Sequence, residues 1–276
     1  MAPSTTTLPT TLPATETLIL HQDGPFLHVT LNRPKARNAM SLAMVNELMA
    51  VFDAIAADTH IRAVVLRGAE GHFCAGGDIK DMAGARAQAA SGDARAFRNL
   101  NRRFGEMITR ANQQPQVIVA VLEGAVLGGG FGLACVSDVA LAADTAQFGL
   151  PETGLGVIPA QIAPFVVQRV GLTQARRLAL TGARFNGAEA ARLGIVHESL
   201  PAEQLDARLA ETLQQIRRCA PEANRQTKQL VLNTLSQPLD QVLDQAAEDF
   251  ARAVASDEGT EGTMAFVQKR LPTWAE

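Results

Sequence analysis

Three short glycine-containing motifs hold the residues of this sequence that could do chemistry. The first ends in the pair Gly76-Gly77, the second is the triple glycine at residues 128–130, and the third ends in Glu152. Glycine lets a ligand approach the backbone closely, and consecutive N–H groups at a helix N-terminus can bind a developing oxyanion. A carboxylate held in place can move protons. Together these residue types indicate oxyanion stabilisation combined with proton transfer.

Each motif also has an ordinary structural explanation when it is taken alone. Paired glycines form tight turns, a triple glycine permits close backbone packing, and a lone Glu152 can serve as a cap or a hydrogen-bond acceptor. A dinucleotide-binding loop is not indicated, because Leu133 stands where the third glycine of that fingerprint would be, and no P-loop lysine follows. A nucleotide-binding oxidoreductase is therefore the least favoured function.

The elements that must position these motifs follow from the apolar pattern. Short apolar runs predict strands at residues 63–66, 117–122 and 139–142, each leading toward one of the motifs. The helix that begins at the triple glycine is apolar nearly all round, which is typical of a buried helix. Further predicted elements are a hairpin at residues 18–32, helices at residues 41–55, 97–108, 174–180, 188–192, 205–217 and 241–255, and a weakly helical or mobile excursion at residues 83–94. Because the strand signal nearly vanishes after Pro159, a layered α/β core followed by a helical part is expected.

The overall composition limits the class of protein. The 276 residues are 47% apolar and 19% charged, which is typical of a globular protein, and the formal net charge of −3 gives no basic field for nucleic acid. No run approaches the roughly 18 apolar residues that a membrane span needs. Three cysteines without a C-x-x-C pair argue against a disulfide framework or a zinc site, and the Thr/Pro-rich start does not resemble a signal peptide. The sequence predicts a soluble cytoplasmic protein with no metal, nucleic-acid partner or membrane partner.

Taken together and in their order, the motifs resemble those of the enoyl-CoA hydratase/isomerase family, the crotonases. Residues 31–39 resemble the family's opening strand and CoA loop, and residues 74–79 resemble its first oxyanion loop. Residues 124–134 resemble the second oxyanion loop, and residues 149–152 resemble the catalytic turn. Residues 266–270 resemble the C-terminal segment that reaches the CoA of a neighbouring subunit. The resemblance extends over nearly the whole chain.

The resemblance implies a fold, a substrate class and an assembly. The expected fold is α/β, a crotonase-type spiral of β-β-α turns with a helical C-terminal assembly region. Residues 1–15 are expected to form a disordered tail, residues 16–180 the core with the active site, and residues 181–276 the helical region for oligomerisation and CoA contact. An acyl-CoA thioester is the implied substrate, CoA is part of that substrate so that no separate cofactor is expected, and the implied assembly is a homotrimer or a hexamer built as a dimer of trimers.

The resemblance also assigns roles to individual residues. By position, Gly77 and Gly129 match the two N–H donors of the oxyanion hole, and Glu152 matches the family's second catalytic glutamate. The implied contacts to substrate and CoA are Lys35, Ala36, Arg37, Ala75, Gly77, Asp78, Ile79, Lys80, Gly128, Gly129, Phe266 and Lys269. The basic residues among them, Lys35, Arg37 and Lys80, are equally compatible with being solvated surface cations.

One position departs from the pattern of typical hydratases. They carry a first glutamate in the helix after the triple glycine, where this chain has Gly132. The two-carboxylate mechanism therefore does not carry over intact. Either Glu152 alone takes the proton from water and then protonates Cα, or a group of the substrate or a bound water takes the role of the missing glutamate. The missing side chain is expected to leave space beside the substrate's Cβ for a branch.

A second departure from the pattern of typical hydratases narrows the resemblance to one group within the family. Residues 158–167 replace a glycine-rich stretch and, with residues 130–133, resemble the hydratases of branched glutaconyl-CoA thioesters in leucine and acyclic terpene degradation. Residues 149–167 and the ending at residues 266–274 resemble the isohexenylglutaconyl-CoA hydratases most. The leading hypothesis is a hydro-lyase that hydrates a 3-branched glutaconyl-CoA, with isohexenylglutaconyl-CoA preferred and 3-methylglutaconyl-CoA next. Alternatives are a straight-chain enoyl-CoA hydratase, another crotonase reaction such as an isomerase or thioester hydrolase, and a catalytically silent assembly module.

Overall fold

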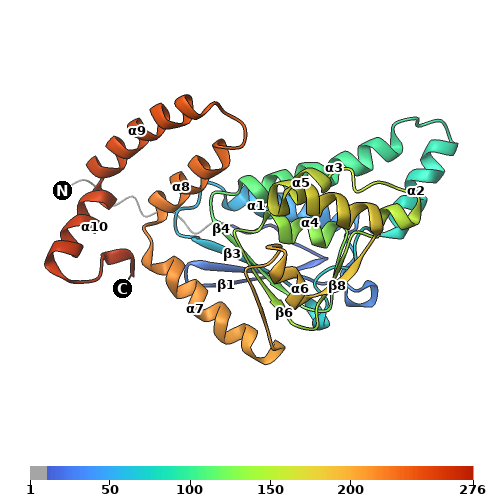
Figure 1. Ribbon diagram of the computed structural model, residues 1–276, viewed down its shortest axis with the longest axis horizontal. Helices are drawn as coiled ribbons and strands as arrows, with labels where there is room; N and C mark the ends of the chain where they lie inside the picture. The colour runs from blue at the N-terminus through green and yellow to red at the C-terminus, as the bar shows by residue number, and fades with distance from the viewer. Residues whose placement is uncertain (1–10, 276) are drawn as a thin grey trace.

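A computed structural model describes residues 11–275 of the chain as layers of helices on two β-sheets (Figure 1). The predicted tail falls largely on residues 1–10, which lie outside the described residues. The larger sheet has the strand order β1-β2-β3-β4-β6-β9, and the smaller has the order β5-β7-β8. Among the strand pairs of residues 11–275, only β1/β2 and β7/β8 are antiparallel.

The strands are short, and most of those in the larger sheet are buried on both faces. The larger sheet contains β1 (Leu18–Asp23), β2 (Phe26–Leu31), β3 (Ala63–Gly68), β4 (Val117–Leu122), β6 (Val139–Ala143) and β9 (Glu198–Leu200). The smaller sheet contains β5 (Ala125–Leu127), β7 (Gln147–Gly149) and β8 (Arg184–Asn186). Continuous apolar runs such as β4 are typical of parallel strands covered on both sides.

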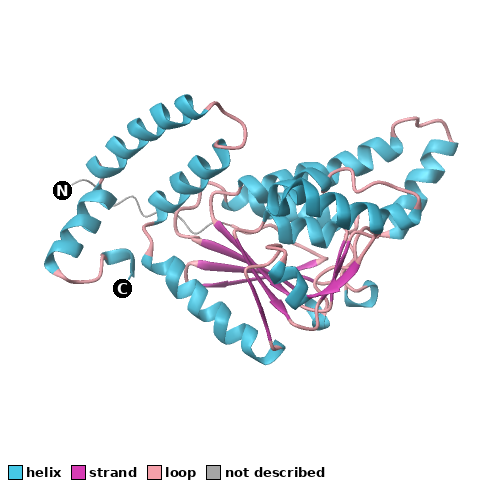
Figure 2. Ribbon diagram, in the orientation of Figure 1, coloured by secondary structure: helices cyan, strands magenta, loops and turns pink. Residues whose placement is uncertain are grey.

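Helices cover the sheets and form a C-terminal arm (Figure 2). They are α1 (Leu42–Ile55), α2 (Ile79–Ala90), α3 (Ala96–Gln113), α4 (Gly129–Val136), α5 (Ala163–Thr181), α6 (Gly187–Arg192), α7 (Leu205–Arg218), α8 (Pro221–Asn233), α9 (Leu239–Ala255) and α10 (Asp257–Gln268). In Figure 1, α1, α3, α4 and α5 gather on one side of the strands, whereas α7 lies on the other. The arm of α8, α9 and α10 extends from the end of the molecule opposite α2. The expected α/β fold with a helical C-terminal region is confirmed.

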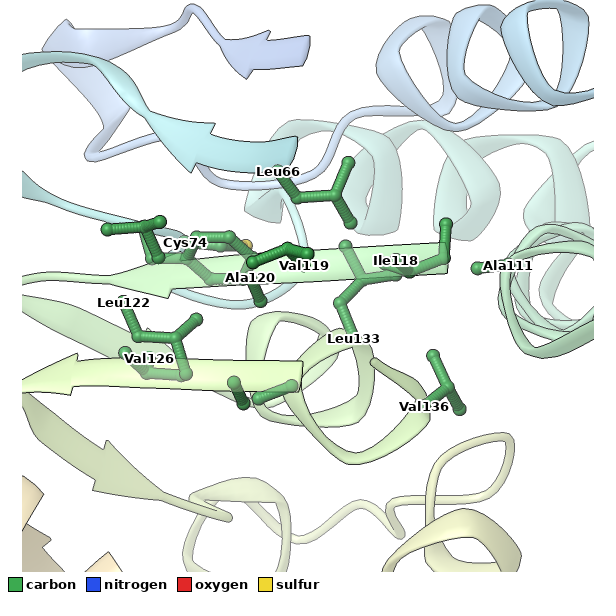
Figure 3. Packing of buried hydrophobic residues seen from close by; sticks show 14 of the residues in the cluster. Leu66, Cys74, Ala111, Ile118, Val119, Ala120, Leu122, Val126, Leu133 and Val136 are labelled. Atoms are coloured by element: carbon green, nitrogen blue, oxygen red, sulfur yellow. The ribbon is translucent and has the colours of Figure 1, made fainter. Parts of the chain in front are cut away.

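The core lies where α4 meets β4. Residues 130–136 of α4 are all buried, as its apolar surface predicts. Figure 3 shows Leu133 and Val136 of this helix beside Ile118 of β4, with Leu66 of β3 in the same cluster. Close packing around α4 fixes the position of its N-terminus, which is the second glycine motif.

Several predicted elements match the structure closely. The hairpin forms as β1 and β2, and Ser41 caps α1 by accepting a hydrogen bond from the N–H of Met44 at 3.2 Å. Of the two alternatives predicted for residues 83–94, weakly helical or mobile, the structure has a helix for most of the length, since α2 runs to Ala90. Its N-cap is Asp78, whose Oδ1 accepts from the N–H of Lys80 at 2.7 Å, and Ala85 is its buried residue.

Strands β8 and β9 are additions that the sequence did not predict. Each has three residues, which is too short for an apolar pattern to be recognised. Both join the sheets, so residues beyond 180 contribute strands to them. The division at residue 180 stays a prediction about domain organisation. No helix among residues 11–275 is both long and apolar enough to cross a bilayer.

Candidate active site

The first glycine motif presents the N–H of Gly77 to solvent. Met40 pairs with this loop in parallel: its N–H donates to the carbonyl of Gly76 at 2.8 Å, and its carbonyl accepts from the N–H of Asp78 at 2.9 Å. The residue between two such bonds turns its own N–H away from the partner strand. Gly77 is exposed between two buried neighbours, and within the described part of the chain its N–H has no hydrogen-bond partner.

The second motif presents the N–H of Gly129. Gly128 has φ 50° and ψ −115°, a backbone conformation that requires glycine, and its N–H donates to the carbonyl of Gly149 at 3.1 Å. Gly129 is the first residue of α4, so its N–H lies at the positive end of the helix dipole. It is partly exposed while Gly128 and Gly130 are buried, and its N–H has no partner among residues 11–275.

The two loops and Glu152 meet at one point. A Cβ atom built at Gly128 would lie 2.8 Å from Oε1 of Glu152 and 3.4 Å from Cα of Gly76. The N–H of Leu127 donates to the carbonyl of Cys74 at 2.9 Å, which ties the second loop to the first. The structure therefore brings together the three motifs that the sequence singled out.

Glu152 carries a carboxylate with one buried oxygen that the described part of the protein leaves without a partner. It is the first residue of a 3-10 turn (Glu152–Leu155) that follows β7. Its Oε2 is buried and has no hydrogen-bond partner in the described part of the protein. Burial raises the pKa of Glu152 above its ordinary value, and its own backbone N–H offsets this only in part. A carboxyl group with a raised pKa beside two free N–H donors is suited to general acid–base chemistry.

The prediction that Gly132 leaves empty space for a substrate branch is wrong. A Cβ atom built there would lie 2.4 Å from Cγ2 of Ile162 and 2.8 Å from Cδ1 of Ile108. The position of the missing glutamate side chain is thus filled by two aliphatic side chains, from the segment before α5 and from α3. A substrate branch cannot occupy that volume, and any branch must lie elsewhere along the pocket.

Residues of the predicted CoA loop lie next to the first oxyanion loop. Lys35, Ala36 and Arg37 are exposed in and after a 3-10 turn (Pro34–Ala36). The carbonyl of Arg37 accepts from the N–H of Ala75 at 3.0 Å, so the two loops are joined through the backbone. The basic side chains are available to phosphates, and their contact with CoA stays a prediction.

At the start of α2, the side chain of Asp78 is bonded within the protein, whereas those of Ile79 and Lys80 are exposed to solvent. The carboxylate of Asp78 caps α2 and forms an ion pair with Arg33, so it holds the loop in place. Ile79 is 82% exposed and Lys80 is also exposed. An apolar side chain so open to solvent at the mouth of the site is suited to contact with a bound substrate.

Phe266 and Lys269 do not join this site within one chain. Both lie at the end of α10, in the arm at the opposite end of the molecule from α2 (Figure 1). Phe266 is 86% exposed, and Lys269 ends the helix in a left-handed conformation with φ 54°. Their predicted contact with CoA therefore requires a second copy of the chain.

Sequence patterns did not identify the side chains that cover Gly129. A Cβ atom built at Gly129 would lie 3.0 Å from the Phe104 ring and 3.4 Å from Sδ of Met40. Phe104 belongs to the helical repeat of α3, and nothing in its local sequence distinguishes it from a core residue. Among residues 11–275, no group of three or more His, Cys, Asp or Glu side chains is placed to hold a metal ion. The predicted lack of a cofactor stays a prediction.

Comparisons with known proteins agree with this geometry. The sequence model of the family described as enoyl-CoA hydratase/isomerase matches residues 23–276. Among solved structures, Pseudomonas aeruginosa AtuE is 64% identical, with a TM-score of 0.92 over 95% of this chain and 100% of that one. The probable enoyl-CoA hydratase echA8 of Mycobacterium bovis is 34% identical over 93% of this chain and 97% of its own. The 2,3-dehydroadipyl-CoA hydratase of Escherichia coli is 30% identical over 92% and 97%, respectively.

Proposed function

Because this chain belongs to the enoyl-CoA hydratase/isomerase family, we propose that it hydrates 3-branched glutaconyl-CoA thioesters, isohexenylglutaconyl-CoA first and 3-methylglutaconyl-CoA next. Like its relatives that are named enoyl-CoA hydratases, it is an enzyme of the hydro-lyase class that acts on acyl-CoA. The observation that carries the proposal is the buried, unpartnered Oε2 of Glu152 beside the two glycine loops, in which the N–H groups of Gly77 and Gly129 have no partner among residues 11–275.

The two N–H groups are suited to hold the thioester carbonyl oxygen. Addition of water at Cβ moves negative charge onto that oxygen, and fixed donors stabilise this charge without reorganising during the reaction. Gly77 belongs to a loop pinned by Met40, and Gly129 begins a buried helix, so neither donor has to move. Loss of one such donor typically lowers the rate by about 10²–10³-fold.

Glu152 is proposed to carry out both proton transfers. The ionised carboxylate takes a proton from water as the water oxygen bonds to Cβ, and the electrons of the double bond pass to the thioester oxygen. Glu152 then gives the same proton to Cα, which completes the hydration and returns the carboxylate to its starting charge. The raised pKa caused by burial suits both steps, because such a group accepts and releases a proton closer to neutral pH.

The choice of the acyl group in the proposed substrate is supported by the sequence resemblance and by the name of one relative. Residues 149–167 and 266–274 resemble those of isohexenylglutaconyl-CoA hydratases, which supports a role in acyclic terpene or leucine degradation. The Escherichia coli relative is named for 2,3-dehydroadipyl-CoA, a thioester that also ends in a carboxylate. A pocket for a dicarboxylic acyl chain is therefore compatible with this family.

The CoA moiety is proposed to bind over Lys35, Arg37 and Lys80, with Phe266 and Lys269 supplied by a second subunit. The position of the C-terminal arm far from its own site supports a trimer or hexamer (Figure 1). A cytoplasmic location stays a prediction from the cysteine pattern.

A straight-chain enoyl-CoA hydratase or isomerase is the second candidate. It is favoured by the filled space at Gly132, which offers no room for a branch at that point. It is also favoured by the general name of the Mycobacterium bovis relative.

A panel of thioesters separates the candidates. Purified protein is incubated with 3-methylglutaconyl-CoA, isohexenylglutaconyl-CoA, 3-methylcrotonyl-CoA and crotonyl-CoA, and the loss of enoyl absorbance is followed. The proposal predicts the highest kcat/KM for the two glutaconyl thioesters. A clear preference for crotonyl-CoA would support the straight-chain alternative and contradict the proposal.

A further inference from the structure

We infer that Gly84 of α2 is a specificity-determining residue, because it keeps open a cavity between α1, α2 and α3 that holds the far end of the substrate's 3-branch. This inference rests on the proposed function for the identity of the branch, since an isohexenyl group is long enough to leave the catalytic centre and a methyl group is not. It places the branch away from Gly132, where two aliphatic side chains fill the space.

The cavity has a volume of about 430 Å³ and lies between the start of α1, the length of α2 and the first half of α3. Figure 1 shows α2 beside the start of α3, at the end of the molecule opposite the C-terminal arm. Pockets of about 300–1,000 Å³ commonly take small ligands. Leu42, Ala85, Ala96 and Leu100 form the apolar part of its lining. The volume and this apolar lining are suited to an aliphatic chain.

Two walls of the cavity lead back to the oxyanion hole. On α3, Leu100 lines the cavity, and Phe104, one turn later on the same face, lies 3.0 Å from a Cβ atom built at Gly129. On the side of α1, Leu42 lines the cavity two residues after Met40, whose Sδ would lie 3.4 Å from the same Cβ atom and whose backbone pairs with the first oxyanion loop. Because one helical turn is about 5.4 Å long, the cavity begins within the length of an isohexenyl chain from the catalytic centre.

Three polar side chains of the lining are bonded to the protein, and an apolar ligand would leave these bonds intact. Nε of Arg103 donates to Oδ1 of Asn46 at 2.8 Å, and Nη1 of Arg103 donates to Oε2 of Glu106 at 2.8 Å. Oδ2 of Asp81 accepts from the N–H of Leu42 at 2.6 Å. An aliphatic chain can therefore lie against this wall without depriving these groups of their partners.

Gly84 is the position at which α2 itself widens the cavity. It lies in the second turn of the helix and lines the cavity, and a Cβ atom built there would have nothing of residues 11–275 within 4 Å except its own helix. Glycine inside a helix is less stable than alanine, so neither helix stability nor close packing explains a glycine here. At Gly132, by contrast, a built Cβ atom would meet Ile162 at 2.4 Å. The side chain that Gly84 lacks gives its space to the cavity.

The test compares two glutaconyl thioesters that differ only at the branch. Each buried CH₂ group is worth about fourfold in binding, so Gly84→Leu, which excludes two or three carbons from the cavity, should lower kcat/KM for isohexenylglutaconyl-CoA roughly 10–60-fold. The value for 3-methylglutaconyl-CoA should change little. Gly84→Ala should have a smaller effect on turnover and a Tm above that of the wild type, because the fold does not need the glycine. Ala83→Leu places the same side chain on the outer, exposed face of α2 and should leave both kcat/KM values unchanged.

Protection of an introduced thiol supplies a readout that needs no turnover. Gly84→Cys is combined with Cys219→Ser, because Cys219 is exposed whereas Cys74 and Cys135 are buried. The probe 3,7-dimethyloct-6-enoyl-CoA carries the isohexenyl chain on a saturated C2–C3 bond, and it should slow alkylation of the introduced thiol by iodoacetamide. The short probe 3-methylbutyryl-CoA has a methyl group in place of that chain and should leave the alkylation rate unchanged.

Several results would overturn the assignment of Gly84. They are equal effects of Gly84→Leu on the two glutaconyl thioesters, a Tm of Gly84→Ala below that of the wild type, and equal alkylation with the long and short probes. Wild-type protein that hydrates crotonyl-CoA but neither glutaconyl thioester would instead overturn the proposed function. Thiol protection does not depend on hydration, so the two failures are distinguishable.

Discussion

At the scale of single residues, Gly129 allows its N–H to be removed with a matched control. Gly129 is the first residue of α4, where proline is tolerated because its missing N–H has no helical partner. Gly129→Ala keeps the N–H but adds a Cβ atom that would meet the Phe104 ring at 3.0 Å. Relative to Gly129→Ala, Gly129→Pro should lower kcat by about 10²–10³-fold. Steady-state kinetics checks this, and equal kcat values in two folded variants would remove Gly129 from the oxyanion hole.

Glu152 links function to stability through its pKa. Burial raises the pKa of the folded state, so the folded protein binds this proton more tightly than the unfolded chain does. The free energy of unfolding therefore falls as pH rises from the ordinary range of a glutamate through the raised pKa. Glu152→Gln removes this pH-dependent loss of stability, so the Tm of the variant should exceed that of the wild type at neutral pH.

Thermal melts across acid to neutral pH check the sign of this effect. At acid pH the wild-type carboxyl group is protonated and resembles the amide, so the two Tm values should converge. A Tm of Glu152→Gln that lies below the wild type at neutral pH, and stays parallel to it at all pH values, would contradict a raised pKa.

The sequence predicted which residues meet at the site but not what surrounds them. Gly77, Gly129 and Glu152 were identified because glycine motifs and a carboxylate keep a recognisable order along the chain. The filling of the space at Gly132 was missed, because Ile162 comes from another segment and its packing depends on the tertiary fold.

At the scale of elements, the packing of α4 against α3 and the segment before α5 can be tested at Gly132. Gly132→Ala introduces a Cβ atom 2.4 Å from Ile162, and overpacking of this kind typically costs about 1–3 kcal/mol of stability. The double variant Gly132→Ala/Ile162→Ala frees that space and should cost less than the sum of the two single changes. Urea unfolding of the single and double variants measures this coupling.

Additive free energies in that cycle would mean that Ile162 does not fill the space above Gly132. The same packing predicts that Gly132→Glu does not supply a second catalytic carboxylate. A glutamate there would have to displace two aliphatic side chains before it could reach the substrate.

Elements with strong periodicity were predicted well, and short ones were not. Helix α1 and strand β4 end where the sequence placed their ends, because caps and apolar runs mark them. Helix α2 lacks an apolar stripe, and β8 and β9 have three residues each, so their pattern is too weak to be read. Their structure depends on a cap and on pairing with strands distant in sequence.

At the scale of the whole molecule, the C-terminal arm exposes apolar side chains that a monomer would leave in water. On α9 and α10, Leu239, Leu243, Phe250, Phe266 and Val267 are each more than half exposed. Exposed apolar patches of this kind indicate a contact with another chain. The predicted trimer or hexamer would cover them and bring Lys269 to a neighbour's CoA.

Light scattering at micromolar concentration should therefore report a trimer or hexamer. Phe250→Glu should shift the assembly toward smaller species, because a charge would enter the apolar contact. Asp244→Asn, at an exposed position of the same helix, serves as the control. A monomeric wild type would contradict both the assembly and the role of Lys269.

The role of Glu152 in proton transfer is tested most directly by the turnover of Glu152→Gln with 3-methylglutaconyl-CoA. The amide keeps the size of the side chain but cannot take a proton from water or give one to Cα. Glu152→Gln should lower kcat by at least about 10²–10⁴-fold, with little change in the binding of glutaryl-CoA. Hydration by Glu152→Gln at the wild-type rate would contradict this role, because the protons would then be moved by another group.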